Sequence, residues 1–292
     1  MTFVVFLGSL FTTFCGGSAG KEGSAISMGG TLGDFIGRKF NLSDDEERTL
    51  VICGVGSAFG VIYDVPFAGA ILGMELILKG RFHYSALIPA FFTTVVSNEI
   101  AIRVGSKAIQ YPNLILDNSS KVYNKVTKNP YIKAILGGVI TIILFFLVGD
   151  NYNGLGQSFI NESFNNYVSI MDPILKILFT AVALGSVFQG GRGHPTFFVG
   201  ATLGSFVAKY INLPLPSVTS LGMIGVFCSA TSLPMTSITI ALEYFGGEEM
   251  VAIILVMTIS YIISGFYDIL YKRKLPKEKA MLFEGYVHKN KE

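Results

Sequence analysis

The sequence predicts an all-α integral membrane protein, built as an inverted repeat of short helices. Only 14% of its residues are charged and 51% are hydrophobic, whereas an average soluble domain has about 25% charged residues. Long apolar runs recur along the chain, as in a protein with several membrane spans. Short helices interrupted by glycine and proline also occur at matching places in the two halves, which is typical of an inverted-repeat transporter.

The first half of the repeat is predicted to span residues 1–103. Residues 2–15 carry no positive n-region and no small-residue cleavage site, so we interpret them as a retained short membrane helix rather than a secretory signal. Their abrupt apolar start suggests that the first helices of the fold are missing. Most predicted helices are shorter than the roughly 20 residues of a full span, so several are expected to cross at a tilt or only partway. The further predicted helices are 24–39, 50–63, 66–78 and 85–102, with a polar break at 41–50. Within this break, Ser43 can cap a helix and residues 44–47 suit its first turn.

A polar connector, residues 104–131, leads into the second half, residues 132–272. Residues 150–167 form a polar loop, which lies on the opposite side of the membrane from the connector if helix 132–148 spans it. Seven of the 22 Lys and Arg residues follow Tyr271, so the polar tail at 273–292 is predicted to be cytoplasmic. The predicted helices of this half are 132–148, 174–188, 195–208, 221–229, 234–245 and 251–270.

The two halves share the order of their breaks and helices. A glycine-rich break occurs at residues 16–23 in the first half and at residues 190–195 in the second. Further along each half, residues 66–75 and 234–243 begin with proline and end with glutamate at identical spacing. Each of these features alone is an ordinary helix start. Their matched order favours an inverted repeat, in which half-helix N-termini point at an anionic substrate near the bilayer midplane.

The most unusual stretch is GGSAGKEGSAISMGG, residues 16–30. It places Lys21 and Glu22 between Gly20 and Gly23 within an apolar region. A helical run follows, so Glu22 is predicted near a helix N-terminus, where N–H groups and the helix dipole attract anions. A carboxylate there can occupy the place of the anion. An ionisable residue among membrane segments is a candidate functional residue, and a solvated loop is the alternative.

Several segments together resemble the motifs of the CLC chloride channels and chloride/proton antiporters. GKEGS with the following Gly29 and Gly30 is similar to the family's G(K/R)EGP segment, and GGRGHP is similar to its GGxFxP anion loop. The resemblance covers residues 1 to about 272, in the order and spacing of the family. The other matching segments are VPFAGAILGMEL at 65–76, ATSLPMTSITIALE at 230–243 and GFYDIL at 265–270.

This resemblance implies a re-entrant helix bundle and a role for individual residues. Glu22 matches the glutamate that blocks the pathway and swings aside or becomes protonated to let anions pass. Arg192 and Gly193 match positions whose backbone N–H groups face the anion, and Tyr267 matches a tyrosine whose hydroxyl donates to it. An interfacial position is the alternative for Tyr267. The residues implied to bind the anion are Gly20, Lys21, Gly23, Arg192, Gly193, His194 and Tyr267.

The chain also departs from the family pattern. The GSGxP segment, which supplies a serine donor to the anion, has no counterpart, and Ser24 replaces a proline. Arg192 and His194 stand where the family has apolar residues. They are expected either to hold an anion or form a pH-sensitive latch, because histidine has an unperturbed pKa near 6.5, or else to face water at the membrane edge.

Glu75 matches the first of two adjacent acids in the antiporters and is a candidate for a proton pathway. The second acid, their internal proton acceptor, falls on Leu76. The resemblance therefore favours passive anion conduction or a proton route through other residues. An alternative for both Glu75 and Glu243 is that they pack against polar backbone.

The predicted function is transport of chloride or a similar small anion, as a channel or an anion/proton exchanger gated by Glu22. The resemblance implies a homodimer in the cell membrane. One alternative is an incomplete family member that needs another chain or is inactive, and another is an unrelated inverted-repeat secondary transporter. We expect neither an enzyme nor a nucleic-acid partner, because the net charge is only +2 and no nucleophile–base set is visible.

No cofactor or metal is expected. The histidines, His83, His194 and His288, are scattered rather than grouped as metal ligands. The cysteines, Cys15, Cys53 and Cys228, lie in apolar surroundings without CxxC spacing, so they are interpreted as small buried side chains without a disulfide.

Overall fold

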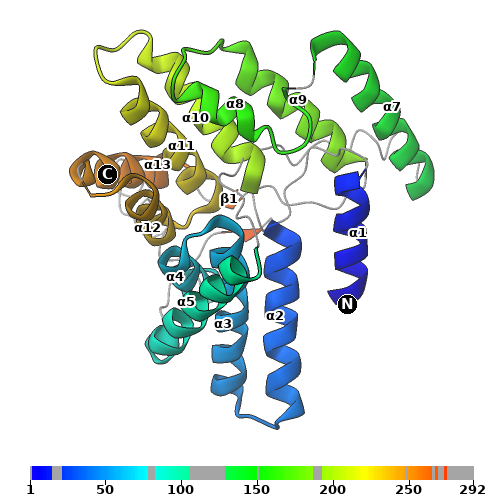
Figure 1. The fold of residues 1–292 in the computed structure, drawn as a ribbon, viewed down its shortest axis with the longest axis vertical. Helices are drawn as coiled ribbons and strands as arrows, with labels where there is room; N and C mark the ends of the chain where they lie inside the picture. The colour runs from blue at the N-terminus through cyan, green and yellow to red at the C-terminus, as the bar shows by residue number, and fades with distance from the viewer. Residues whose placement is uncertain are drawn as a thin grey trace, which may run out of the picture.

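The computed structural model is a bundle of helices with one very short pair of strands (Figure 1). The predicted all-α class is therefore correct, with the strands as a small addition. The Cys15 position, nearly all of the predicted connector and most of the tail fall outside the described residues. The structure describes residues 2–14, 22–77, 83–105, 129–149, 151–186, 193–247, 249–264, 267–268 and 273–274.

The helices of the first part of the chain follow the predicted order. They are α1 (Thr2–Phe14), α2 (Glu22–Lys39), α3 (Asp44–Tyr63), α4 (Pro66–Ile77), the 3-10 helix η1 (Tyr84–Ala86) and α5 (Leu87–Arg103). Within the predicted polar break at 41–50, the acidic residues form the first turn of α3, as their pattern predicts. Ser43 explains this start, since its backbone N–H and its hydroxyl both donate to the Glu46 carboxylate, at 2.9 and 2.6 Å.

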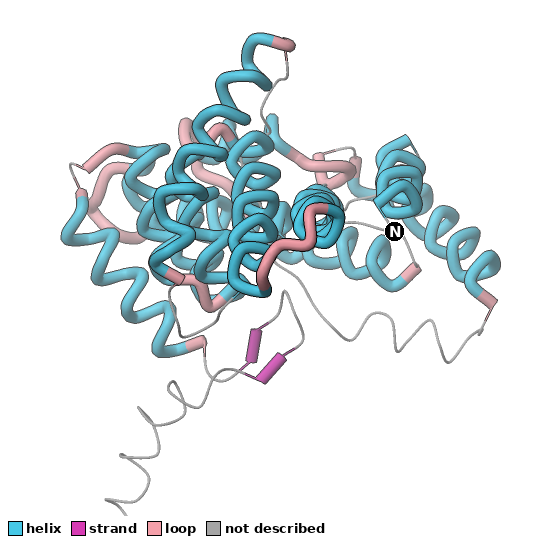
Figure 2. Tube along the Cα trace, turned by 90° about the horizontal axis from the view of Figure 1, so that it is seen from below, coloured by secondary structure: helices cyan, strands magenta, loops and turns pink. Residues whose placement is uncertain are grey.

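The second part of the chain contains α7 (Pro130–Val148), α8 (Gln157–Ser163), α9 (Met171–Gly185), α10 (Gly193–Ala208), α11 (Leu215–Thr231), α12 (Pro234–Phe245) and α13 (Met250–Ile263). The predicted polar loop at 150–167 contains α8. The helix predicted at 221–229 is longer than expected and has Pro216 in its first turn. The helix predicted at 251–270 was wrong at its end, because α13 stops at Ile263. An antiparallel pair follows, β1 (Tyr267–Asp268) and β2 (Arg273–Lys274), beside the packed helices (Figure 2).

Glycine brings several helices into backbone contact, including α2 with α3 and α10 with α11. A Cβ added to Gly29 of α2 would lie 2.2 Å from the carbonyl oxygen of Gly54 in α3. In the second part, a Cβ on Gly200 of α10 would lie 2.6 Å from the carbonyl oxygen of Gly222 in α11. Small residues of this kind allow helices in lipid to approach closely. The contacts hold α2 and α10, the helices that carry the site, in fixed positions on α3 and α11.

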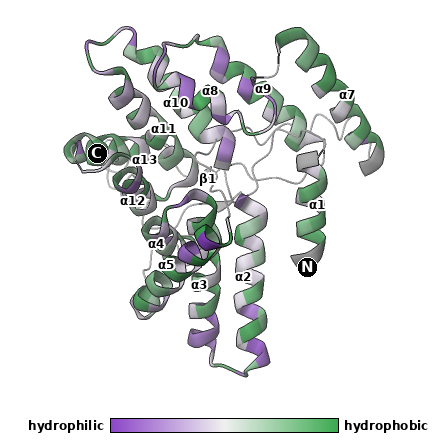
Figure 3. Ribbon diagram, viewed as in Figure 1, coloured by the Kyte–Doolittle hydropathy of each residue, from purple (hydrophilic) through white to green (hydrophobic). Residues whose placement is uncertain are grey.

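The surface of the bundle is largely apolar. Figure 3 shows hydrophobic residues along most of α1 and α7, and hydrophilic residues at the turn between α2 and α3. Among the described residues, the stretch Tyr84–Arg103 is the one helix long and apolar enough to cross a membrane, by length and composition. The shorter apolar helices are Pro66–Ile77, Ile132–Val148, Leu215–Thr231 and Met250–Ile263.

The packed core lies where the two parts of the chain meet. Its buried aromatic side chains come from the end of α3, the loop before α8, and α9, α10 and α11: Phe59, Tyr63, Tyr152, Phe179, Phe197, Phe198 and Phe227. Phe197 and Phe227 contact each other with ring centroids 4.9 Å apart. The candidate site lies at this junction, so its geometry depends on packing between segments far apart in the sequence.

Candidate anion site at the N-termini of α2 and α10

The N-termini of α2 and α10 face each other near the centre of the bundle (Figure 1). Glu22 is the first residue of α2, as its sequence context predicts, and its side chain is only 5% exposed. Its Oε1 atom accepts a hydrogen bond of 2.8 Å from the backbone N–H of His194, in the first turn of α10. Because the first N–H groups of a helix have no partner within the helix and carry partial positive charge, the carboxylate lies where an anion would bind.

Gly193 makes this approach possible. A Cβ at Gly193 would lie 2.6 Å from Glu22 Oε1 and 3.0 Å from Glu22 Cγ, closer than atoms can pack. The glycine predicted from the GGRGHP motif is therefore in contact with the predicted gate. The two residues are far apart in the sequence and come together because α2 and α10 meet end to end.

His194 takes part in the site through its backbone. Its imidazole is 1% exposed, which does not fit the alternative in which this residue faces water. The backbone N–H reaches the carboxylate, whereas the sequence drew attention to the titratable ring.

The remaining predicted site residues are placed less completely. Gly20, Lys21 and Arg192 lie outside the described residues. Gly23 follows Glu22 in the first turn of α2. The backbone of Tyr267 pairs with Lys274 in the short sheet, and the position of its side chain is not among the described features, so its predicted role stays a prediction.

Sequence reasoning missed Tyr63, the last residue of α3. Tyr63 is 1% exposed, and its hydroxyl lies close enough to the Glu22 carboxylate to interact with it electrostatically. The hydroxyl makes no hydrogen bond of normal geometry with any described residue. A tyrosine at the end of an apolar helix gave no local signal, because its closeness to Glu22 depends on how α3 packs.

Glu75 and Glu243 occupy equivalent positions in a reciprocal arrangement. Glu75 of α4 accepts hydrogen bonds at the N-terminus of α12, from the backbone N–H and the hydroxyl of Thr236, at 2.9 and 2.6 Å. Glu243 of α12 accepts hydrogen bonds at the N-terminus of α4, from the backbone N–H groups of Phe67 and Ala68, at 3.0 and 2.7 Å. The matched proline-to-glutamate spacing thus has a structural cause, because each helix caps the start of the other.

A buried lysine that the sequence analysis did not single out holds the loop before α8. Lys176 of α9 is fully buried, and its Nζ donates to the carbonyl oxygens of Tyr152 and Gly154, at 3.0 and 2.8 Å. The same ammonium lies 5.0 Å from the ring centroid of Phe198 in α10. Lys176 therefore fixes this loop against the helix whose N-terminus binds Glu22.

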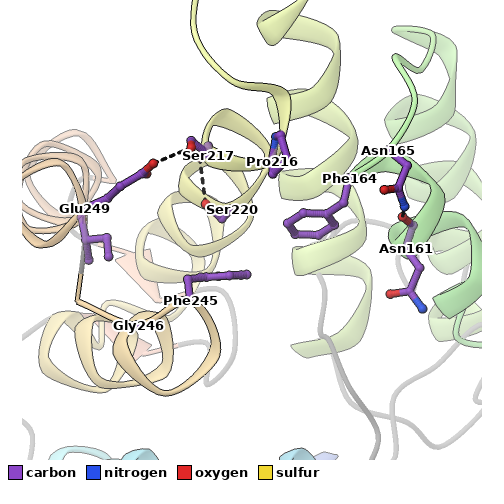
Figure 4. A pocket seen from close by; sticks show the side chains of 10 residues that line it. Asn161, Phe164, Asn165, Pro216, Ser217, Ser220, Phe245, Gly246 and Glu249 are labelled. Carbon is purple, nitrogen blue, oxygen red and sulfur yellow. Dashed lines mark hydrogen bonds between the residues drawn. The ribbon is translucent and has the colours of Figure 1, made fainter.

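One cavity lies away from Glu22. It has a volume of about 450 Å³ between α8, α11, α12 and α13, and its lining includes Asn161, Phe164, Phe245 and Glu249. Figure 4 shows the Ser217 hydroxyl donating to the Glu249 carboxylate at its rim. This cavity shares no lining residue with the Glu22 site. Within the described segments, no three His, Cys, Asp or Glu residues are grouped as metal ligands.

A carboxylate held on a helix N-terminus inside an apolar helix bundle is the arrangement expected of the class of membrane proteins that transport anions. Comparison with known families agrees, because the model of the voltage gated chloride channel family matches residues 1–118 and 100–265. The chain belongs to this family.

Its relatives include solved and curated proteins. A chloride/fluoride channel protein of Pseudomonas syringae pv. tomato is 27% identical over 313 residues, covering 94% of this chain and 69% of the relative. An H(+)/Cl(-) exchange transporter of Vibrio campbellii is 22% identical, covering 89% of this chain and 65% of the relative. The crystal structure of a CLC-type fluoride/proton antiporter matches with a TM-score of 0.84 and 27% identity, over 93% of this chain and 76% of that one.

These comparisons confirm the family predicted from the motifs, the helical membrane fold and the class of function, anion transport across the cell membrane by a multi-pass protein. They do not favour the unrelated secondary transporter. The family consists of transporters rather than enzymes in the usual sense. The chain spans about two thirds of the length of the curated relatives described above.

Proposed function

We propose that this chain moves a small halide across the cell membrane along a path that Glu22 closes. The observation that carries the proposal is the hydrogen bond between the Glu22 carboxylate and the backbone N–H of His194. The bond places a negative charge of the protein where a helix N-terminus favours an anion. An anion and the carboxylate therefore compete for one position, and departure or protonation of Glu22 frees it.

We propose fluoride and chloride as the substrates. Two relatives at 27% identity support fluoride, since one is named a chloride/fluoride channel protein and the other a fluoride/proton antiporter. The resemblance to the family also supports a homodimer. Glu75 stays a candidate for a proton pathway. Its contact with the backbone N–H of Thr236 also makes it a cap for the N-terminus of α12.

The test is halide efflux from liposomes that contain only the purified chain, recorded with ion-selective electrodes and with external pH. We expect efflux, and we expect Glu22→Gln to raise it or to remove its pH dependence, because the glutamine resembles the protonated gate. Glu162→Gln, an exposed glutamate of α8, is the matched control and should leave efflux unchanged. Unchanged flux in Glu22→Gln would remove Glu22 as the gate.

The pH trace distinguishes the two modes of transport. Efflux without proton movement identifies a channel. Coupled proton movement identifies an exchanger and contradicts the argument from Leu76. A folded preparation without efflux would instead support the alternative in which this chain needs another chain for activity.

A further inference from the structure

Tyr63 is a buried hydrogen-bond donor directed at the site. Its side chain is 1% exposed, and its hydroxyl lies close enough to the Glu22 carboxylate to interact with it. Among the described residues, the hydroxyl makes no hydrogen bond of normal geometry. Buried polar groups are nearly always satisfied, since leaving one unpaired costs free energy. When the Glu22 carboxylate moves away, the Tyr63 hydroxyl loses this neighbour, and an anion in the same place would give it a hydrogen-bond acceptor.

The neighbourhood of Glu22 contains donors from both parts of the chain. The backbone N–H of His194 binds Oε1 from the side of α10. The Tyr63 hydroxyl lies near the same carboxylate from the end of α3. Between them, an anion that replaced the carboxylate would meet a backbone N–H and a phenol O–H.

Contacts on every side hold Tyr63 in place. Its carbonyl oxygen accepts a hydrogen bond of 2.8 Å from the hydroxyl of Tyr244 in α12. Its ring packs on Phe59, with centroids 4.6 Å apart. Asp64, the next residue, has a left-handed conformation with φ of 55° and accepts a hydrogen bond of 2.8 Å from Asn98 in α5. The phenol is therefore positioned before any ligand arrives, which lowers the cost of binding.

We propose that the Tyr63 hydroxyl is a ligand of the transported anion and favours fluoride over chloride. This inference rests on the proposed function. When the Glu22 carboxylate leaves, the anion accepts one hydrogen bond from the His194 N–H and one from Tyr63. A neutral donor binds an anion without the fixed charge that would trap it, as conduction requires. Fluoride concentrates its charge in a smaller radius than chloride does, so it gains more from the same donor.

Two variants separate this role from a role in holding the gate shut. Glu22→Gln and the double variant Glu22→Gln/Tyr63→Phe are purified beside the unaltered chain and Tyr63→Phe, and fluoride and chloride binding are measured by calorimetry. A hydrogen bond to a charged group contributes about 1.5–3 kcal/mol, so we expect the double variant to bind fluoride about tenfold or more weakly than Glu22→Gln. The loss for chloride should be smaller. Tyr167→Phe in the same background, at an exposed tyrosine, is the control and should leave both affinities unchanged.

Several outcomes would overturn the inference. Equal fluoride affinities in Glu22→Gln and the double variant would show that Tyr63 does not contact the anion. A Tyr63→Phe effect seen only when Glu22 is intact would assign the phenol to the gate instead. If Glu22→Gln binds no halide, the proposed function fails and the inference falls with it. Thermal unfolding of each variant checks folding, and removal of an unsatisfied hydroxyl is not expected to lower stability.

Discussion

Glu22 and Gly193 depend on each other at the site, because the carboxylate of Glu22 lies where a side chain on Gly193 would be. The carboxylate fits against α10 because Gly193 leaves room for it. We predict that Gly193→Ala strongly lowers halide flux, because the new Cβ would fill the space of the carboxylate and of any anion that replaces it. The measurement is the liposome efflux described for the proposed function, run beside Glu22→Gln, which should act in the opposite direction.

The control for this substitution is Gly138→Ala in α7, where an added Cβ meets no atom within 4 Å. It should keep normal flux and gain slightly in helix propensity. Flux that persists in Gly193→Ala would mean that anions do not pass between Glu22 and α10.

At the residue scale, the sequence predicted the parts of the site that depend on local pattern. The glycines around Glu22 indicated a helix start, and the structure begins α2 at this residue. The GGRGHP motif drew attention to Gly193 and His194, although the ring of His194 rather than its backbone was emphasised. Tyr63 was not predictable, because the chain carries no local mark of which buried tyrosine will lie beside a carboxylate from another helix.

At the scale of helices, α4 and α12 stabilise each other through their reciprocal caps. We predict that Glu75→Ala and Glu243→Ala each lower stability by roughly 0.5–2 kcal/mol, the usual cost of removing a side chain that caps a helix N-terminus. The double variant should lose less than the sum, because both caps act on the same helix pair and neighbouring changes couple. Thermal unfolding in detergent measures the shifts.

Glu99→Ala in α5 is the matched control for the caps. Glu99 is exposed, and within the described part of the chain its ion pair is with Arg103 one turn away, so the expected change is small. Additive losses in the double variant would mean that the two caps act independently, and no loss in either single variant would mean that the caps contribute nothing.

The sequence predicted helices better than their ends. The proline starts of α4 and α12 were correct, because proline at the first helical position is a local signal. The Ser43 cap and the acidic first turn of α3 were also predicted, because they form a local capping pattern, although the apolar part of the helix was placed from residue 50 onward. The end of α13 was missed although Gly265, directly after the C-cap Ser264, is a typical C-terminal signal, because the apolar run was interpreted as continuing to Leu270.

At the scale of the whole molecule, the two parts of the chain meet through a small set of directed contacts. Glu22 binds α10, Glu75 and Glu243 cap each other's helices, and Tyr244 binds the carbonyl of Tyr63. Each contact joins residues more than 150 positions apart. The repeated spacing indicated that both halves carry equivalent helices, but only the packed structure shows which group reaches which partner.

The placement of the chain in the membrane can be tested at α7. This helix has 19 residues, which corresponds to about 28 Å at 1.5 Å per residue, close to the roughly 30 Å of a bilayer's hydrocarbon core. We predict that Asn129→Cys and Asn151→Cys, at exposed positions before and after α7, react with a membrane-impermeant maleimide from opposite sides. The background for both variants is a chain whose own cysteines are replaced, studied in sealed vesicles of known orientation.

Ile142→Cys, in the middle of α7, is the third variant whose labelling is measured in this experiment. Its side chain in α7 is 56% exposed in the isolated chain, so in water it would react readily. If α7 crosses the membrane, lipid covers this position and the reagent reaches it from neither side. Labelling of Asn129→Cys and Asn151→Cys from one side would show that α7 turns back, and it would contradict the predicted placement of the connector and the 150–167 loop on opposite faces.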